Sequence, residues 1–195
     1  MSLPLVLASS SPYRRALFDR LTIPYQCCSA NIDETPLPSE TPRHLSRRLS
    51  LEKAQALTSA YCSHLIIGSD QVAAAGDTLL GKPGNIERAA RQLRLASNNR
   101  IKFYTSVTLL NSKTGEFKTQ TDITTVHFRD LTDNEIRAYL ETEQPYDCAG
   151  SFKVEGLGIA LFKRIDNSDP TALIGLPLIR LTTMLGDMGV RILNK

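Results

Sequence analysis

The stretch over residues 65–70 constrains the fold of this chain more than any other. Residues 65–67 form a short apolar run with two β-branched side chains, which predicts a buried central strand. Gly68 and Ser69 follow, and then Asp70 stands where we expect the strand to end. Ligands in open α/β sheets bind near strand ends, and an acid there can hold a metal ion or take a proton from water. The alternative is that Asp70 only caps a turn.

A second polar junction follows the N-terminal apolar segment. Residues 3–8 predict a strand, and Ser11 and Pro12 suit the N-cap and first position of a helix that reaches about Leu21. Arg14 falls in its first turn. Free backbone N–H groups, the helix dipole and an arginine fork together favour phosphate binding. An ordinary capped helix with exposed arginines is the alternative.

The rest of the chain alternates between strand and helix patterns, which predicts the α/β class. The expected elements are strand 25–29, a long helix from Thr41, helix 86–96 capped by Asn85, a hairpin of strands 101–110 and 116–128, a helix from Thr132 to about 143, strand 158–165 and a last helix from Pro177. On the helix from Thr41, we expect Arg43, Arg47 and Arg48 to face solvent, whereas Glu52 or Lys53 could point at a site.

Residues 76–83 match a P-loop pattern in every position but the last. A P-loop needs Ser or Thr there for magnesium, and Pro83 has neither a hydroxyl nor an N–H group. No clear strand leads into Gly76. We therefore reject the P-loop interpretation and keep Lys82 as a candidate point charge for a phosphate.

Composition excludes several classes of protein. The net charge of this 195-residue chain is only +3, which is too small to indicate nucleic-acid binding. No apolar run approaches the roughly 20 residues of a membrane span, and the N-terminus lacks the basic flank of a signal peptide. We therefore expect a cytoplasmic protein. The four cysteines include an adjacent pair but no C-x-x-C motif, which favours reduced thiols.

The remaining motifs narrow the chemistry. The sequence contains no G-x-S-x-G, and its three histidines lack H-E-x-x-H spacing. What is left is an acid at a strand end, several separate basic residues and a serine-rich helix start. This collection suits metal-assisted attack of water on a phosphoanhydride.

Seven segments, in order along nearly the whole chain, resemble the Maf family of nucleoside triphosphate pyrophosphatases. They are residues 8–15, 33–36, 52–54, 68–72, 81–83, 148–152 and 175–177. The resemblance implies a single domain over residues 1–195 with a Maf/ITPase-like α/β fold. In that fold a long central mixed sheet is flanked by helices, and two lobes surround a cleft. It also implies hydrolysis of a nucleotide to its monophosphate and pyrophosphate with a divalent metal cation, Mg or Mn.

The same resemblance implies roles for individual residues. Asp70 matches the catalytic acid that is thought to activate water, and Asp70 and Glu34 match acidic positions that could hold the metal. The positions that match the family's phosphate site are Ser9, Arg14, Lys53 and Lys82.

Three further positions separate branches of the family and imply the base that is recognised. Tyr13, Gln71 and Glu155 resemble the YceF-like branch, which hydrolyses 7-methyl-GTP, although some of its members carry tryptophan at the Tyr13 position. The sister branch, which hydrolyses dTTP and UTP, typically has arginine, threonine and glutamine at these positions. A nucleotide-binding regulator of septum formation without turnover is another alternative. We expect a small-molecule nucleotide as partner, no nucleic acid and no membrane, and we leave a homodimer open.

Overall fold

The computed structural model describes residues 3–193, so that Met1 and Ser2 of the N-terminal segment lie outside the described residues. Its central feature is a seven-stranded sheet with the order β2-β1-β3-β5-β6-β7, in which β4 pairs with β3 off this path. The strands are β1 (Leu5–Ala8), β2 (Gln26–Cys28), β3 (Leu65–Ala75), β4 (Thr78–Leu80), β5 (Arg100–Asn111), β6 (Phe117–Phe128) and β7 (Phe162–Asp166). The α-helices are α1 (Pro12–Asp19), α2 (Pro42–Gln55), α3 (Ile86–Ala96), α4 (Asp133–Glu143) and α5 (Leu178–Asp187).

The sheet is mixed, as predicted. Strand β1 pairs in parallel with both β2 and β3, whereas β4 and β7 pair antiparallel with β3 and β6. Parallel neighbours need long crossover connections, and here these contain α1 and α2. The α/β fold class inferred from the sequence is therefore confirmed.

Local capping chemistry explains where several helices begin. The side chain of Ser11 accepts a hydrogen bond from the backbone N–H of Arg14, and Asn85 caps α3 in the same way. Thr132 and Glu135 form the predicted capping box at the start of α4. Each cap satisfies backbone N–H groups that have no partner within the helix, which is why these starts could be read from the sequence.

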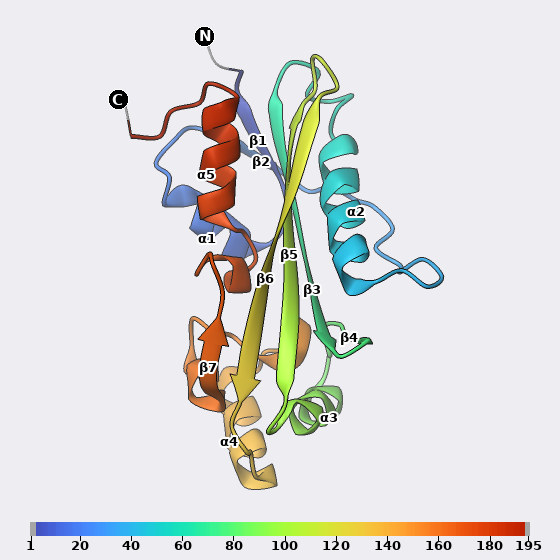
Figure 1. The fold of residues 1–195 in the computed structure, drawn as a ribbon, viewed down its shortest axis with the longest axis vertical. Helices are drawn as coiled ribbons and strands as arrows, with labels where there is room; N and C mark the ends of the chain where they lie inside the picture. The colour runs from blue at the N-terminus through green and yellow to red at the C-terminus, as the bar shows by residue number, and fades with distance from the viewer. Residues whose placement is uncertain (1–2, 194–195) are drawn as a thin grey trace. The chain divides into compact units, whose positions relative to one another are not determined.

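The chain divides into two compact units, which match the two predicted lobes. Unit 1 comprises Met1–Asp70, Thr105–Asp122 and Asp169–Lys195, and unit 2 comprises Gln71–Tyr104 and Ile123–Ser168. In unit 1, the sheet carries helices on both faces: Figure 1 shows α2 on one face and α1 and α5 on the other.

Alternation along the strands of unit 1 sorts its core into two clusters. Leu5, Leu7 and Ile67 pack with apolar side chains of α1 and α5, whereas Val6 and Ile66 pack with apolar side chains of α2. Successive residues of a strand point to opposite faces, so β1 and β3 contribute to both clusters. Side chains on both faces of the strand at residues 65–67 are thus buried, as the sequence predicts.

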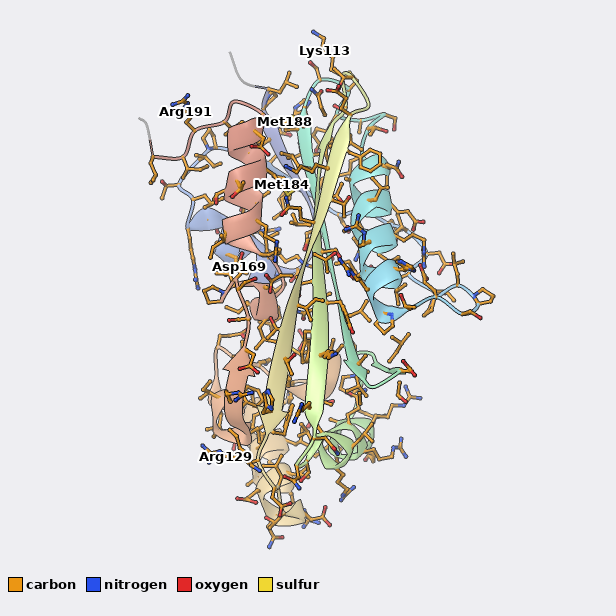
Figure 2. All side chains as sticks on the ribbon, in the orientation of Figure 1. Lys113, Arg129, Asp169, Met184, Met188 and Arg191 are labelled. Atoms are coloured by element: carbon orange, nitrogen blue, oxygen red, sulfur yellow. The ribbon has the colours of Figure 1, made fainter. Side chains whose placement is uncertain are left out.

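The apolar stripe predicted on the last helix packs into the core of unit 1. Leu181 and Leu185 are fully buried, Met184 is 1% exposed, and Met188 packs against the same cluster as a partly buried side chain (Figure 2). At the start of this helix, the Asp169 carboxylate accepts hydrogen bonds from the backbone N–H groups of Ile179 and Arg180.

The contact between α2 and the sheet contains buried hydroxyl groups as well as apolar side chains. The Ser46 hydroxyl lies 2.8 Å from that of Ser106, which in turn lies 2.8 Å from the Thr121 hydroxyl. One helical turn later, Ser50 pairs with Thr108 at 2.9 Å, and Thr108 pairs with a threonine of β6 at 2.7 Å. We call these two chains the hydroxyl ladder. Each buried hydroxyl in it has a partner, which avoids the free-energy cost of an unsatisfied polar group.

Unit 2 has an aromatic core. Four phenylalanine rings contact one another edge to face at centroid distances of 4.8–5.8 Å, a favoured geometry for aromatic pairs. They are Phe103, Phe128, Phe152 and Phe162. This cluster joins β5, β6 and β7 to the chain that follows α4.

Two predicted boundaries were wrong. Strand β3 does not end at Asp70 but continues to Ala75, because residues 73–75 pair with β4 in a hairpin closed at Gly76, whose φ is +58°. The predicted strand 158–165 begins only at Phe162, and a 3₁₀ helix over Leu157–Leu161 takes its first half. The extension of β3 overturns the expectation that no strand leads into Gly76, because β3 ends at the residue before it. The P-loop interpretation stays rejected, because residues 78–80 form β4 and the next helix, α3, begins only at Ile86, past Lys82 and Pro83.

All four cysteines are free thiols, as predicted. Among residues 3–193, no helix combines the length and apolar character needed to cross a membrane.

Candidate active site

Three of the predicted site residues form a chain of ion pairs in unit 1, which we call the Asp70 cluster. The Lys53 ammonium donates to Asp70 Oδ1 at 2.6 Å and lies 2.8 Å from Glu34 Oε1. The side chains of Lys53 and Asp70 are 8% and 7% exposed, whereas that of Glu34 is 56% exposed. The sequence left open whether Glu52 or Lys53 points at a site, and the structure selects Lys53.

A close approach between α2 and β3 makes this contact possible. A Cβ atom on Gly68 would lie 2.0 Å from the Ser50 carbonyl oxygen and 2.9 Å from the Ala54 backbone nitrogen. Only a residue without a side chain fits there, so the helix can pack directly on the strand backbone. Lys53 neighbours Ala54 on this helix, and Asp70 lies two residues beyond Gly68 on the same strand face. The glycine therefore sets the distance between Lys53 and Asp70.

Burial dominates the electrostatics of Asp70. It raises the pKa of the Asp70 carboxyl above its ordinary value of 3.8, and the positive charges of Lys53 and Arg14 oppose that increase. The negative charge of Glu34 raises it further. A carboxylate whose pKa is raised accepts a proton more readily at neutral pH, which suits a general base.

Arg14 belongs to the same electrostatic neighbourhood and is held in place by a carbonyl group. Burial lowers the pKa of its guanidinium, opposed by Asp70 and Glu34. Arginine nevertheless stays protonated in proteins. Its Nε donates to the Gly175 carbonyl oxygen at 2.8 Å, and the Ser69 hydroxyl donates to the same oxygen at 3.0 Å.

Ser69 and Gly175 were not assigned this role from the sequence. Their only signal was their place inside segments that resemble the family. Gly175 has a φ of +128°, a backbone conformation that glycine adopts with little strain. We infer that it is needed there to present its carbonyl oxygen to Arg14.

Ser9 is buried directly after β1 and accepts a hydrogen bond from the Ser11 backbone N–H at 3.1 Å. Ala8, the residue before it, is paired in register with Gly68 of β3. Strand β1 ends there whereas β3 continues, so Asp70 lies just past the end of its parallel neighbour. Asp70 therefore lies beside the end of β1 but not at the end of its own strand, β3.

The loop that carries Glu34 is tied to α2 by Arg48, and this corrects the expectation that Arg48 faces solvent. Its Nε and Nη2 contact the two carboxylate oxygens of Glu40, each at 2.8 Å. Its Nη2 also donates to the Thr35 carbonyl oxygen, and Nη1 contacts Glu52. Arg47 is also half-buried, with its Nη1 3.3 Å from the Thr119 carbonyl oxygen, whereas Arg43 is exposed as expected.

The remaining predicted site residues are Tyr13 in unit 1 and Gln71, Lys82 and Glu155 in unit 2, and their part in the site stays a prediction. Tyr13 is half-buried in α1. Gln71 is half-buried in β3, Lys82 is exposed in the segment after β4, and Glu155 is exposed in residues 153–158, which we call the Glu155 loop. The Glu143 carboxylate holds this loop by accepting a hydrogen bond from the Leu157 backbone N–H at 2.7 Å.

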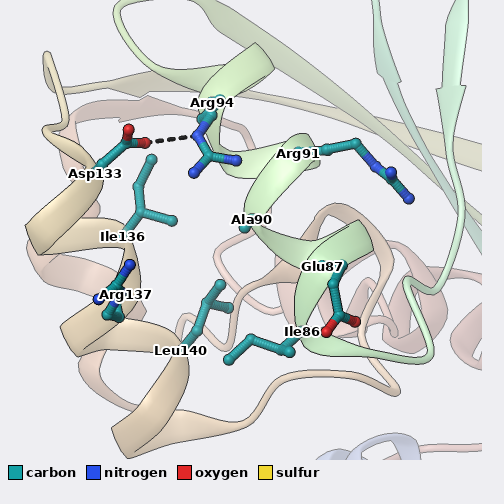
Figure 3. Close-up of a pocket in the computed structure, with 9 residues that line it drawn as sticks. All are labelled: Ile86, Glu87, Ala90, Arg91, Arg94, Asp133, Ile136, Arg137 and Leu140. Carbon is teal, nitrogen blue, oxygen red and sulfur yellow. Dashed lines mark hydrogen bonds and ion pairs between the residues drawn. The ribbon is translucent and has the colours of Figure 1, made fainter.

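A separate groove of about 450 Å³ lies between α3 and α4 in unit 2 (Figure 3). Its walls combine Ile136 and Leu140 with Arg91 and with the ion pair between Arg94 and Asp133. None of the predicted site residues lines it. The sequence therefore did not point to this groove, and it has no part in the chemistry proposed below.

The Asp70 cluster also supplies the hard oxygen donors that a magnesium or manganese ion prefers. Asp70 and Glu34 already share one cation, the Lys53 ammonium, at hydrogen-bond distance. Within the part of the chain that the structure describes, no group of three or more His, Cys, Asp or Glu side chains is arranged to hold a metal. Magnesium is commonly bound by one or two carboxylates together with substrate phosphates, and two carboxylates fit that mode.

A comparison with known protein families agrees with the resemblance of the seven sequence segments. The family model described as Maf-like protein matches residues 4–188. Several curated relatives carry the name 7-methyl-GTP pyrophosphatase. The one from Pseudomonas syringae pv. tomato is 55% identical over 96% of this chain and 98% of its own length. The one from Thiobacillus denitrificans is 54% identical over 97% and 94%. The solved structure of the Staphylococcus aureus Ham1 protein aligns with 65% of this chain and 72% of its own at 15% identity, with a TM-score of 0.47.

Proposed function

We propose, on the premise that the chain belongs to the Maf-like protein family, that it is a pyrophosphatase that hydrolyses 7-methyl-GTP. The products would be 7-methyl-GMP and diphosphate. Relatives that share more than half of their residues with this chain over nearly its full length are named for that activity. The observation that carries the proposal is the buried Asp70 carboxylate, held 2.6 Å from the Lys53 ammonium and close to a second acid.

Asp70 is the proposed catalytic base. A water molecule would lose a proton to the Asp70 carboxylate while the water oxygen forms a bond to the α-phosphorus. The bond between the α- and β-phosphates breaks, and diphosphate leaves with the electron pair. Lys53 holds Asp70 Oδ1 in place, and burial keeps the carboxyl basic enough to accept the proton.

The phosphate chain needs positive charge along its length. Arg14, fixed by the Gly175 carbonyl oxygen, is proposed to contact phosphate oxygens, as are Lys53, Lys82 and the polar groups of Ser9. A divalent cation bound by Asp70 and Glu34 would supply Lewis-acid stabilisation of the charge that develops on the phosphate oxygens.

Selectivity for the base is proposed to come from Tyr13, Gln71 and Glu155. Methylation at N7 makes guanine cationic, and an aromatic ring such as that of Tyr13 attracts a cation by about 0.5–2 kcal/mol. The Glu155 carboxylate would accept hydrogen bonds from N1 and N2 of the base, as carboxylates do from base amino groups elsewhere. Gln71 would add an adaptable amide. A pyrimidine lacks both the positive charge and the paired donors, so it would be rejected.

The test is a substrate screen with the purified protein. Diphosphate release is measured from 7-methyl-GTP, GTP, UTP and dTTP with Mg²⁺, with Mn²⁺ and with a chelator. We expect 7-methyl-GTP to give the highest kcat/KM and the chelator to abolish turnover. A preference for UTP or dTTP would place the chain with the sister branch. Nucleotide binding without turnover under every condition would instead support the regulatory role.

Four further expectations from the sequence stay part of this proposal. They are the identity of the metal, a cytoplasmic location, a single functional domain over residues 1–195, and the lack of a nucleic-acid partner. A homodimer stays open in the same sense.

A further inference from the structure

The most heavily bonded cation among the described contacts around the site is one that the proposed chemistry does not use. Four contacts of the Arg48 guanidinium lie between 2.8 and 3.1 Å, two to Glu40, one to Glu52 and one to the Thr35 carbonyl oxygen. The Glu40 side chain is only 8% exposed and that of Arg48 is 21% exposed. An arginine fork that meets both oxygens of a carboxylate fixes orientation as well as distance.

The contacts of Arg48 converge on the segment that carries Glu34. Residues 33–40 form neither a helix nor a strand, so side chains must define their path. The Asp33 carboxylate accepts from the Thr35 backbone N–H, and Glu40 accepts from that of Leu37. Arg48 joins both ends of this arrangement, because it binds Glu40 and also the Thr35 carbonyl oxygen, one residue beyond Glu34.

Helix α2 carries both Arg48 and Lys53, separated by little more than one turn. The loop is anchored to the first residue, and the carboxylate of the loop reaches the second at 2.8 Å. A rigid helix therefore sets the position of Glu34 relative to the ammonium that also holds Asp70.

We propose that Arg48 is a positioning residue that holds Glu34 in the Asp70 cluster before a nucleotide binds. The proposal rests on the proposed function, since it assigns the order of this loop to the same site. Arg48 touches none of the reacting groups and acts through Glu34. Without it, the half-exposed Glu34 side chain would have to be ordered when substrate binds.

The first experiment follows the loop directly. Amide hydrogen exchange of Thr35 and Leu37 is compared in wild type, Arg48→Ala, Arg48→Lys and the control Arg43→Ala, which removes an exposed arginine from the same helix. Exchange should accelerate in both Arg48 variants and stay unchanged in the control. Unchanged exchange in a folded Arg48→Ala protein would overturn the proposal, whether or not the wild type turns over 7-methyl-GTP. Arg48→Lys retains the positive charge and takes the place of Arg48→Ala in this measurement if Arg48→Ala fails to fold.

The second experiment asks whether the effect passes through Glu34. We expect Arg48→Ala to lower kcat/KM for 7-methyl-GTP by about 10- to 100-fold, because misplacing a catalytic group by about 1 Å can have an effect of that size. Adding Arg48→Ala to a Glu34→Ala protein should lower it by less than about twofold further. Full additivity of the two losses would show that Arg48 acts independently of Glu34, and would overturn the proposal. Absence of turnover by the wild type would contradict the proposed function, not the loop anchor.

Discussion

The Asp70 cluster and the Glu155 loop are built in different ways, although both are assigned to the same substrate. Lys53 and Asp70 lie on a helix and a strand that touch at Gly68, and both side chains are buried. Glu155 is exposed on a loop, and Glu143 holds this loop through the Leu157 backbone N–H. Under the proposed function, the chemistry common to all nucleotides would be set in the packed core. The choice of base would depend on an exposed loop together with Tyr13 on α1 and Gln71 on β3. Loops accept sequence change far more readily than packed elements, so specificity can diverge without damage to catalysis.

Changing Asp70 should have the largest effect on turnover and should affect only the Asp70 cluster. Asp70→Asn keeps the shape of the side chain but cannot accept the proton from water, so kcat should fall by roughly 100- to 10,000-fold for every nucleotide. Diphosphate release measures the loss, and circular dichroism checks that the protein is folded. Asp77→Asn, in the exposed turn between β3 and β4, serves as control. Near-normal turnover by Asp70→Asn would remove Asp70 from the mechanism.

Changing Glu155 should affect only the base selectivity assigned to the Glu155 loop. Charge-assisted hydrogen bonds contribute roughly 1.5–3 kcal/mol each, so Glu155→Gln should lower kcat/KM for 7-methyl-GTP by about 10- to 100-fold. Its kcat/KM for UTP and dTTP should stay the same or rise. Glu141→Gln on the exposed side of α4 controls for the loss of one charge. If Glu155→Gln left the order of the four nucleotides unchanged, the assignment of base specificity would be wrong.

Gly68→Ala should show how far the first region depends on packing. The new Cβ would overlap the Ser50 carbonyl oxygen, and overpacking of this kind costs about 1–3 kcal/mol of stability. Moving α2 would also move Lys53 away from Asp70, so turnover should fall equally for all four nucleotides. Urea unfolding gives the stability. Gly186→Ala on α5, where an added Cβ meets nothing within 4 Å, should be neutral or slightly stabilising.

The smallest expected effect is the pH dependence of the Arg48 anchor. The hydrogen bond from Arg48 holds the pKa of Glu40 below its ordinary value of 4.5. When the pKa of a carboxyl is lower in the folded state, its ionised form stabilises the fold at any pH above its unfolded-state pKa. That stabilisation is lost as the pH falls through its folded-state pKa. Wild type should therefore exceed Arg48→Ala by about 1–2 kcal/mol in unfolding free energy near pH 7. The gap should narrow steadily below pH 4.5. An equal gap at pH 3 and pH 7 would mean that this carboxylate does not contribute to the anchor.

The parts of the fold that depend on short-range chemistry could be predicted from the sequence. Ser11, Asn85 and Thr132 begin helices because each side chain caps the backbone N–H group three residues further on. The hairpin of β5 and β6 could likewise be predicted from local sequence, because a short turn segment joins the two strand patterns. Asp70 and Lys53 were identified through their motifs, and their contact needed only the packing of one helix on one strand.

The parts that were missed depend on partners far away in the sequence. Strand β3 extends past Asp70 because the chain folds back on it as β4, and the alanines in residues 73–75 gave no strand signal of their own. Arg48 has the spacing of an exposed arginine on an amphipathic helix, and its burial results from a loop whose path the sequence does not specify. Glu40 lies outside α2 and eight residues before Arg48, so the pair lacks the i+3 or i+4 spacing of contacting side chains on a helix.

The hydroxyl ladder has a geometric consequence for the alignment of helix and strand. Ser46 and Ser50 are four residues apart on α2, a rise of about 6.0 Å. Their partners Ser106 and Thr108 are two residues apart on β5, a rise of about 6.6 Å. The two repeats are nearly commensurate, so that both hydroxyl pairs meet in one register of the helix against the strand. A slide of α2 by a single turn would leave a buried hydroxyl facing apolar side chains, which fixes the reach of Lys53 toward Asp70.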